Sequence, residues 1–310
     1  MRQRNGLLEI YRLILSFMPL YYHSFFFFER NYDIFDVPEL AVDFFFMLSG
    51  FFLMRSMRKL KDERIIVGVG KMLFGRLKPM LFTMCFISAF NLICLAIFVR
   101  GDYLNSLFQL FKYWWFVLYL MVGVVIYYLV YRALNSERLF VVFLAVVALL
   151  MATVHYLVVE QGMLIYEVVF FTRAFGSVAA GILVSYIPRL KVRKFNHSIP
   201  IVILLIPSLL YLAYNNKTFF ICIAMIVMFG ALMYFSTHIS VGGRFFDFLG
   251  KLSVRMYLYM ALLTMIAMMG LTHHRWLFAI DIAVATIDVV IHNCFEKRSA
   301  RKINRELALK

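Results

Sequence analysis

Long uninterrupted runs of apolar residues dominate the chain and predict transmembrane helices. Residues 79–99 carry no charged side chain over 21 positions, and residues 199–214 are equally uncharged. A hydrocarbon core of roughly 30 Å needs about 20 residues of helix, and lipid supplies no partner for an open backbone. The pattern therefore predicts an all-α, polytopic integral membrane protein with about ten transmembrane helices: 7–28, 36–54, 79–99, 113–131, 139–158, 163–187, 199–214, 218–235, 254–272 and 276–294.

Composition and charge agree with this pattern. The chain is 64% hydrophobic and 16% charged, and its mean hydropathy is +0.84. Its net charge of +15 would suggest nucleic acid for a soluble protein, but 24 Lys and Arg residues fall on the side of the two termini and only 5 on the other. This positive-inside bias predicts cytoplasmic N and C termini in the cell (inner) membrane. The basic charge is expected to meet anionic lipid, with no nucleic-acid partner.

The remaining sequence adds no second domain. No repeat, low-complexity stretch or soluble appendage interrupts the spans, so residues 1–310 are expected to form a single membrane domain. The basic tail 295–310 is expected to be short and cytoplasmic and to lie along the inner membrane surface. The four cysteines fall within the spans without metal-ligand spacing, so they are interpreted as small packing residues and no metal site is expected: Cys85, Cys94, Cys222 and Cys294.

Ionisable residues form a polar stripe along the first span. Arg12 and His23 are eleven residues apart, which places them about 20° apart around a helix and about 16 Å apart along it. Glu9 precedes Arg12 by three residues and shares that face. A charge inside a membrane helix costs at least about 2.5 kcal/mol, so it usually has a use. Two interpretations stay open: a functional stripe, or a structural Glu9–Arg12 ion pair with His23 bonded to a neighbouring helix.

The second span repeats this pattern with Glu39, Asp43 and Gly50 on one face. Gly50 would allow another helix or a ligand to approach closely. Because a short loop joins the first two spans, they are expected to pack as an antiparallel pair, with Arg12 and His23 facing Asp43. The alternative is a buried pairing of the carboxylates with Arg12 that only fixes the packing.

Two further charged sets need an explanation. Residues 55–79 form either an amphipathic helix on anionic lipid or a phosphate-binding mouth for a cytosolic cofactor. Eight cations lie there: Arg55, Arg58, Lys59, Lys61, Arg64, Lys71, Arg76 and Lys78. In later spans, Glu167, Arg173 and Arg255 are interpreted as structural partners of one another. The sequence assigns no role to the stripe in the tenth span, which consists of Asp281, Asp288 and His292.

These residues together resemble the acyltransferase-3 family of bacterial membrane enzymes. The family's first helix carries an acidic residue three before an Arg and a His eleven after it, as Glu9, Arg12 and His23 do here. AVDFFFMLSGFF at 41–52 is similar to the family's second-helix signature, G-V-D-x-F-F-x-x-S-G-F. YWWF at 113–116 and FLGKLSVRMYLY at 248–259 resemble two later family segments.

Two positions depart from the family's pattern. Arg76 and Pro79 match an Arg-x-x-Arg-x-x-Pro element, but Leu73 replaces its first Arg. Met260 stands where many relatives carry a second His, so that His has no part in a mechanism here.

The resemblance implies a membrane O-acyltransferase that uses a cytosolic acyl-CoA, most often acetyl-CoA, and holds no permanent cofactor. Its acceptor would be a hydroxyl of a cell-surface carbohydrate or lipid-linked glycan. His23 would be the base, Arg12 would hold or polarise the donor, and Asp43 would orient either. The donor-binding residues would be Arg76, Lys78, Arg55, Arg58 and Ser49. The alternative is a transporter or flippase for a polar or carbohydrate substrate, although the sequence shows no matching halves with broken helices.

Overall fold

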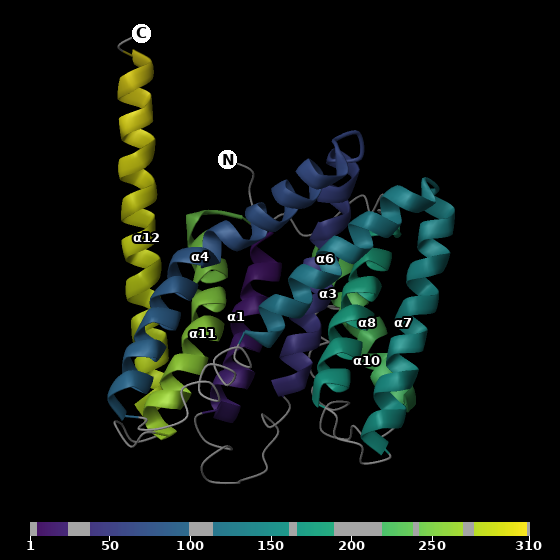
Figure 1. Cartoon of the computed structure of the whole chain (residues 1–310), viewed down its shortest axis with the longest axis horizontal. Coiled ribbons are helices and arrows are strands. Elements are labelled where there is room, and N and C mark those ends of the chain that lie inside the picture. The colour runs from purple at the N-terminus through teal and green to yellow at the C-terminus, as the bar shows by residue number, and fades with distance from the viewer. Residues whose placement is uncertain are drawn as a thin grey trace. The chain divides into compact units, whose positions relative to one another are not determined.

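The computed structural model describes residues 5–23, 38–98, 114–160, 166–188, 219–237, 242–268 and 276–308, and the regular elements in these ranges are helices (Figure 1). The helices are α1 (Gly6–Tyr21), α3 (Pro38–Lys59), α4 (Ile65–Phe98), α6 (Trp115–Leu134), α7 (Glu137–Glu160), α8 (Tyr166–Tyr186), α10 (Phe219–Ser236), α11 (Arg244–Met268) and α12 (Leu277–Ala308). They confirm the prediction of an all-α chain.

Within the described ranges, five helical segments are long and apolar enough to cross a membrane: Ile65–Phe90, Trp115–Leu134, Glu137–Val158, Val168–Tyr186 and Leu277–Phe295. Each overlaps one of the predicted spans. Helices α1, α3, α10 and α11 overlap four more predicted spans, whereas 199–214 lies outside the described residues. The total of ten spans and the cytoplasmic position of both termini stay predictions.

Three predicted boundaries are wrong, in each case because the helix is longer than its apolar run. Helix α4 begins at Ile65 rather than 79, and α11 begins at Arg244 rather than 254. Helix α12 continues to Ala308, so residues 295–308 form the last turns of one straight helix (Figure 1). Lys, Arg and Glu have good helix propensity and extend a helix beyond the part that suits lipid. Hydropathy alone therefore underestimates helix length.

The chain divides into two compact units. Unit 1 comprises residues 1–36, 80–101 and 242–310, and its described helices are α1, the second part of α4, α11 and α12. Helices α1 and α11 run parallel, because Gly6 lies against the ring of Phe246 and Ser16 lies against Met256. Helix α12 runs back along α11 (Figure 1).

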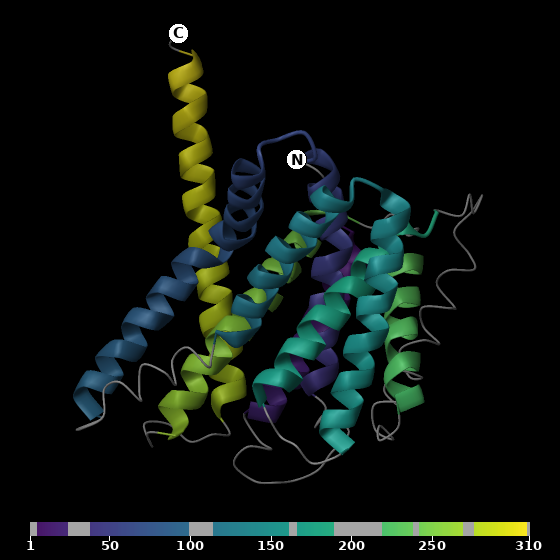
Figure 2. The same cartoon turned by 45° about the vertical axis from the view of Figure 1, so that its right-hand side comes forward.

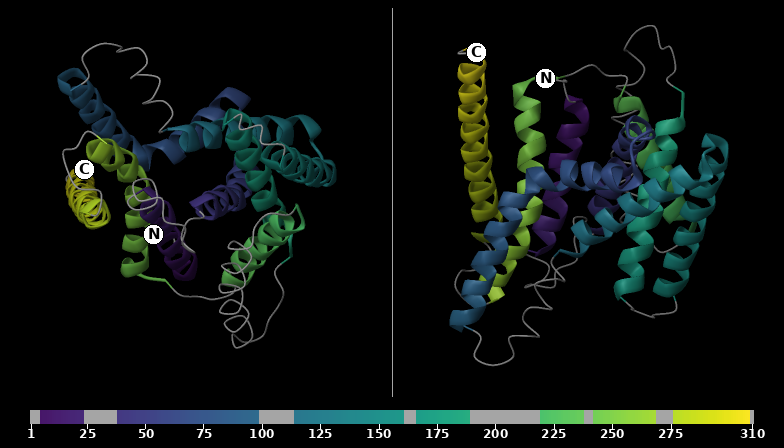
Figure 3. Two further views of the ribbon diagram at one scale, coloured as in Figure 1. Left: turned by 90° about the horizontal axis from the view of Figure 1, so that it is seen from below. Right: turned by 45° about the horizontal axis from the view of Figure 1, so that its top comes forward.

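Unit 2 comprises residues 37–79 and 102–241 and contains α3, α6, α7, α8, α10 and the first part of α4. Helix α8 packs against both α3 and α7, and α6 contacts all three; Figures 2 and 3 show these helices side by side. Aromatic side chains fill the interior. The ring of Trp115 stacks on Phe170 with 4.1 Å between centroids, and the Tyr127 hydroxyl donates to the carbonyl oxygen of Phe175 at 2.7 Å.

Two glycines bring α3 and α8 into close contact. A Cβ at Gly50 would lie 3.0 Å from the carbonyl carbon of Val178 on α8, and one at Gly181 would lie 2.6 Å from that of Met47 on α3. Carbon atoms in contact normally stay at least about 3.5 Å apart, so neither position has room for a side chain. Small residues permit this close approach in membrane helix pairs. The prediction that Gly50 lets another helix approach closely is confirmed.

Two of the cysteines do not pack inside their unit. Cys85 on α4 and Cys294 on α12 are exposed free thiols, so their interpretation as packing residues is wrong. The outer face of a transmembrane helix meets lipid, where a thiol behaves as a small apolar group.

Candidate functional site

Helix α1 begins with a cap that fixes its first turn. The side-chain oxygen of Asn5 accepts hydrogen bonds from the backbone N–H groups of Leu7 at 3.1 Å and Leu8 at 3.3 Å. Glu9 stands in this turn, where a carboxylate is also favoured by the helix dipole. Nη1 of Arg12 donates to Oε2 of Glu9 at 2.8 Å, and Glu9 is only 5% exposed. The ion pair expected as the structural alternative is therefore present, nearly buried in unit 1.

His23 lies just beyond the last α-helical turn of α1. Pro19 cannot donate a backbone hydrogen bond, and Tyr22 and His23 continue the chain in a wider π-helical turn. Such turns are frequent at functional sites. The imidazole is half-buried, with Nδ1 inside, and it meets the Tyr22 ring edge to face at 5.3 Å. One helix thus carries Arg12 and His23 at two depths of unit 1.

Asp43 on α3 is bound by two side chains of α8. Arg173 donates through Nε to Oδ1 at 3.2 Å and through Nη2 to Oδ2 at 3.1 Å, and the Ser177 hydroxyl donates to Oδ1 at 3.4 Å. Arg173 is 7% exposed. Asp43 belongs to unit 2, whereas Arg12 and His23 belong to unit 1. The orientation of Arg12 or His23 by Asp43 stays a prediction, as does the pairing of the first two spans.

A second buried cluster joins α4, α11 and α12 within unit 1. Oδ2 of Asp288 accepts hydrogen bonds from the hydroxyls of Thr83 at 2.7 Å and Tyr259 at 3.3 Å, and it lies 3.6 Å from Nε of Arg255. Asp281, seven residues before Asp288, is 0% exposed. Neither of its carboxylate oxygens has a hydrogen-bond partner among the described residues.

These contacts give both intramembrane arginines a carboxylate that the sequence interpretation did not name. Arg173 binds Asp43, and Arg255 lies beside Asp288. The side chain of Glu167 lies outside the described residues, so its pairing stays a prediction. An arginine inside an apolar helix signals that a carboxylate must lie nearby, but spacing along the chain does not say which one.

The expected donor-binding residues lie on α3 and the first part of α4, in unit 2. Arg55, Arg58 and Lys78 are exposed, whereas Arg76 is half-buried. Arg58 donates through Nε and Nη2 to the two carboxylate oxygens of Glu137 on α7, at 3.1 and 3.0 Å. The hydrogen bond to Glu137 raises the pKa of Arg58. Arg58 would have to break its hydrogen bonds to Glu137 before Nε and Nη2 could both bind a phosphate.

Three of these residues make contacts within their own helix. The Ser49 hydroxyl donates to the carbonyl oxygen of Phe45 at 2.8 Å. Nη1 of Arg76 donates to the carbonyl oxygen of Met72 at 3.4 Å, and the Lys78 ammonium lies 5.8 Å from the centre of the Phe74 ring. Arg76 and Lys78 therefore turn back along α4, and no described contact ties either to another helix.

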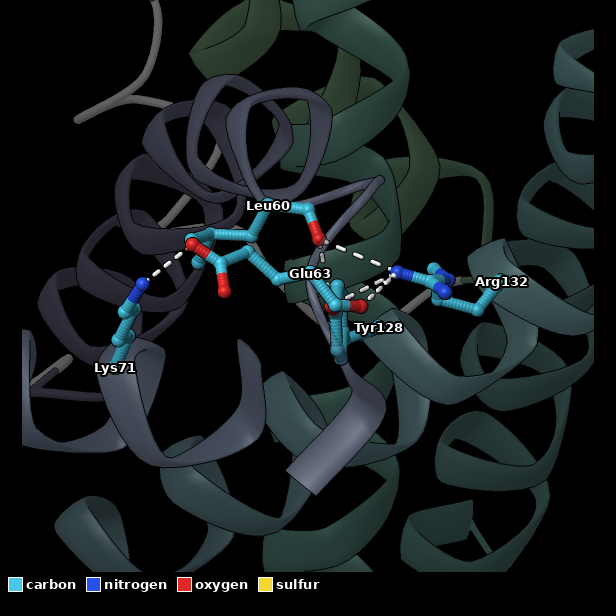
Figure 4. Close-up of polar contacts among 5 residues, drawn as sticks. All are labelled: Leu60, Glu63, Lys71, Tyr128 and Arg132. Atoms are coloured by element: carbon cyan, nitrogen blue, oxygen red, sulfur yellow. Dashed lines mark hydrogen bonds and ion pairs between the residues drawn. The ribbon is translucent and has the colours of Figure 1, made fainter. Parts of the chain in front are cut away.

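A hydrogen-bond network holds the turn between α3 and α4 (Figure 4). Nη1 of Arg132 on α6 donates to the carbonyl oxygens of Leu60 at 3.3 Å and Glu63 at 2.7 Å, and the Tyr128 hydroxyl donates to Leu60 at 2.8 Å. The Glu63 side chain forms an ion pair with Lys71. The last carbonyls of a helix need such partners, so α6 holds the turn that lies within the basic segment, residues 55–79. The sequence interpretation did not include Arg132 or Tyr128.

The described residues contain no group of three or more His, Cys, Asp or Glu that could hold a metal ion. The chemistry that they offer is therefore that of single ionisable groups: a half-buried imidazole, a buried ion pair on the same helix, and exposed cations elsewhere.

Comparison with known proteins identifies a family. A family model described as an acyltransferase domain, that of the acyltransferase-3 family, matches residues 8–291. No curated protein and no solved structure matches the chain. The matched region contains Glu9, Arg12, His23, Asp43 and the basic segment, and it spans both units. With this match and its apolar helices, the chain belongs to the acyltransferase-3 family and is a multi-pass membrane protein with an acyltransferase domain.

Proposed function

We propose that this protein transfers an acyl group, acetyl by preference, from cytosolic acyl-CoA to a hydroxyl of a cell-surface or lipid-linked carbohydrate. One observation carries the proposal: within an acyltransferase domain, α1 holds a nearly buried Glu9–Arg12 pair, and the turn that continues it holds a half-buried His23. Acyl transfer needs a base near the acceptor and a positive charge near the donor, and these residues supply both.

The proposed step starts at the acceptor hydroxyl. His23 removes its proton as the oxygen attacks the thioester carbonyl. The carbon–sulfur bond then breaks, and the CoA thiolate takes up the proton that His23 gives back, so the imidazole is neutral again. The imidazole suits this task because its neutral form is abundant near pH 7. Arg12 stabilises the negative charge that develops on the carbonyl oxygen or holds the donor.

The donor is proposed to meet the basic segment through its phosphates. Arg55, Arg58 and Lys78 are exposed and present positive charge at one end of unit 2, where an anionic ligand gains from each contact. Arg76 is half-buried and would contact a donor phosphate only at close range. The competition of Glu137 for Arg58 makes that residue the weakest member of the set.

Transfer of labelled acyl groups in membranes with equal amounts of each variant tests this function. His23→Gln should lower the transfer rate by about 10²–10⁴-fold while acyl-CoA binding stays near that of the parent, because a base acts on the rate and not on donor affinity. His155→Gln on α7 is the matched control, since it replaces another partly buried histidine, and it should transfer at the parental rate.

Two results would contradict the proposal. Near-normal transfer by His23→Gln would return His23 to a packing role. Movement of an intact carbohydrate across the membrane without acyl-CoA consumption would favour a transporter instead.

A further inference from the structure

The carboxylate of Glu9 lies directly over the backbone of α11 at Gly250. A Cβ built at Gly250 would stand 2.5 Å from Cδ and 3.1 Å from Oε1 of Glu9, and closer still to Oε2. Carbon atoms in contact keep about 3.5 Å, so any side chain here would overlap the carboxylate by about 1 Å. The carboxylate occupies the space that a larger residue would need.

A glycine inside a helix lowers the stability of the helix, so the absence of a Cβ at this position needs an explanation. Gly250 is inside α11, six residues after its start at Arg244 and well before its end at Met268. A glycine in a helix interior costs roughly 0.5–1 kcal/mol relative to alanine. Nothing in the backbone requires it, because Gly250 has no left-handed conformation. The close approach of Glu9 is the feature that explains it.

The surrounding contacts fix α1 against α11 on both sides of this point. Gly6 lies against the Phe246 ring, one turn before Glu9, and the Ser16 hydroxyl lies 3.9 Å from the sulfur of Met256, two turns beyond it. Because both neighbours hold the helices in register, an intruding methyl at Gly250 cannot be relieved by sliding α1. The Glu9 side chain itself would have to move.

We propose that Gly250 is a positioning residue for the donor: it seats the Glu9 carboxylate, which in turn orients Arg12. This inference rests on the proposed function of Arg12 in donor binding. The bond between Nη1 of Arg12 and Oε2 of Glu9 is 2.8 Å long. A displacement of about 1 Å takes that distance past the limit of a hydrogen bond, near 3.5 Å. Arg12 then loses its hydrogen bond to Glu9, which helps to orient the guanidinium.

The experiment uses four full-length chains in one detergent and measures acyl-CoA binding by titration: the parent, Gly250→Ala, Glu9→Asp, and the double variant Glu9→Asp/Gly250→Ala. Gly250→Ala should weaken binding about tenfold or more, which matches loss of a charge-assisted hydrogen bond. Aspartate withdraws the carboxylate by one methylene, about 1.5 Å, and so frees the space that alanine needs. The double variant should therefore bind within about threefold of Glu9→Asp.

Gly123→Ala on α6 is the matched control, because a Cβ there would meet only Tyr127, at 4.0 Å. It should bind as the parent does. The inference is overturned if Gly250→Ala binds as tightly as the parent or more tightly, or if Glu9→Asp does not rescue it. Should Gly250→Ala fail to yield monodisperse protein, recovery of that yield by Glu9→Asp supports the inference and no recovery overturns it.

Arg12→Ala separates this inference from the proposed function. If Arg12→Ala binds acyl-CoA normally, the donor role of Arg12 is wrong. If Arg12→Ala loses binding while Gly250→Ala keeps it, only the positioning role of Gly250 fails.

Discussion

Replacement of Asp43 by alanine should remove a two-pronged ion pair that Arg173 makes inside unit 2. Arg173 donates two hydrogen bonds to Asp43, at 3.2 and 3.1 Å, and only 6% of its side chain is exposed. The positive charge would stay buried between α3 and α8, whose backbones are held close by Gly50 and Gly181. Water has little room to replace the lost partner.

The size of the effect follows from the burial of each group. Removal of one member of a buried ion pair costs about 3–5 kcal/mol. The Asp43 side chain is 25% exposed, so some solvation remains and the expected loss is about 2–3 kcal/mol. Ser177→Ala removes only a 3.4 Å hydrogen bond and should cost about 0.6 kcal/mol, as for similar bonds in membrane proteins.

The assay is thermal unfolding of purified variants in one detergent, together with acyl transfer per folded molecule. Asp43→Ala should unfold about 4–12 °C below the parent, at about 2–4 °C per kcal/mol. The pair Asp43→Leu/Arg173→Met removes both charges and should be more stable than Asp43→Ala alone. Equal unfolding temperatures for parent and Asp43→Ala would refute the reasoning. If the charge-free pair also regains transfer, Asp43 acts through packing and does not orient His23.

Three further substitutions test other parts of the structure. Glu137→Gln should tighten acyl-CoA binding by up to about fivefold in titration calorimetry, because the exposed Arg58–Glu137 ion pair, worth about 0.2–1 kcal/mol, no longer competes with the donor for Arg58. Unchanged or weaker binding would show that Arg58 does not bind the donor. Arg132→Met should speed amide hydrogen exchange in residues 60–68, because the Glu63 carbonyl loses its side-chain donor and the Leu60 carbonyl keeps only Tyr128. An unchanged exchange rate there would show that the turn does not depend on Arg132. Asp281→Leu should raise the unfolding temperature. A buried carboxyl group without a partner among the described residues lowers the free energy of unfolding, and an apolar side chain does not. A lower unfolding temperature would mean that this carboxyl group is stabilised in the membrane.

Local features of the site could be predicted from the sequence. A spacing of three residues puts Glu9 and Arg12 on one helix face, and the structure shows them bonded. Apolar runs likewise located the described spans, since lipid allows few alternatives to a helix. Gly50 also followed from sequence, because a glycine beside polar residues in a span indicates close helix contact.

Contacts between distant helices could not be predicted in this way. Asp43 and Arg173 are 130 residues apart, and nothing in either segment says that α3 packs on α8. The same limit applies to Gly250, whose partner Glu9 is 241 residues away. Which helices become neighbours depends on the packing of the whole unit, and a single sequence does not contain that information in any local pattern.

The buried ion pairs of the described residues differ in what they hold together. Asp43–Arg173 links α3 to α8, and Arg255–Asp288 links α11 to α12, so each fixes one helix against another. The bond between Glu9 and Arg12 lies within α1, and it leaves the Arg12 side chain 18% exposed, against 6% for Arg173 and 4% for Arg255. An arginine that bonds to its own helix and keeps some access to solvent is better placed to meet a ligand than one that bridges two helices. On this ground Arg12, rather than Arg173 or Arg255, is the arginine whose loss should reduce acyl transfer more than it reduces stability.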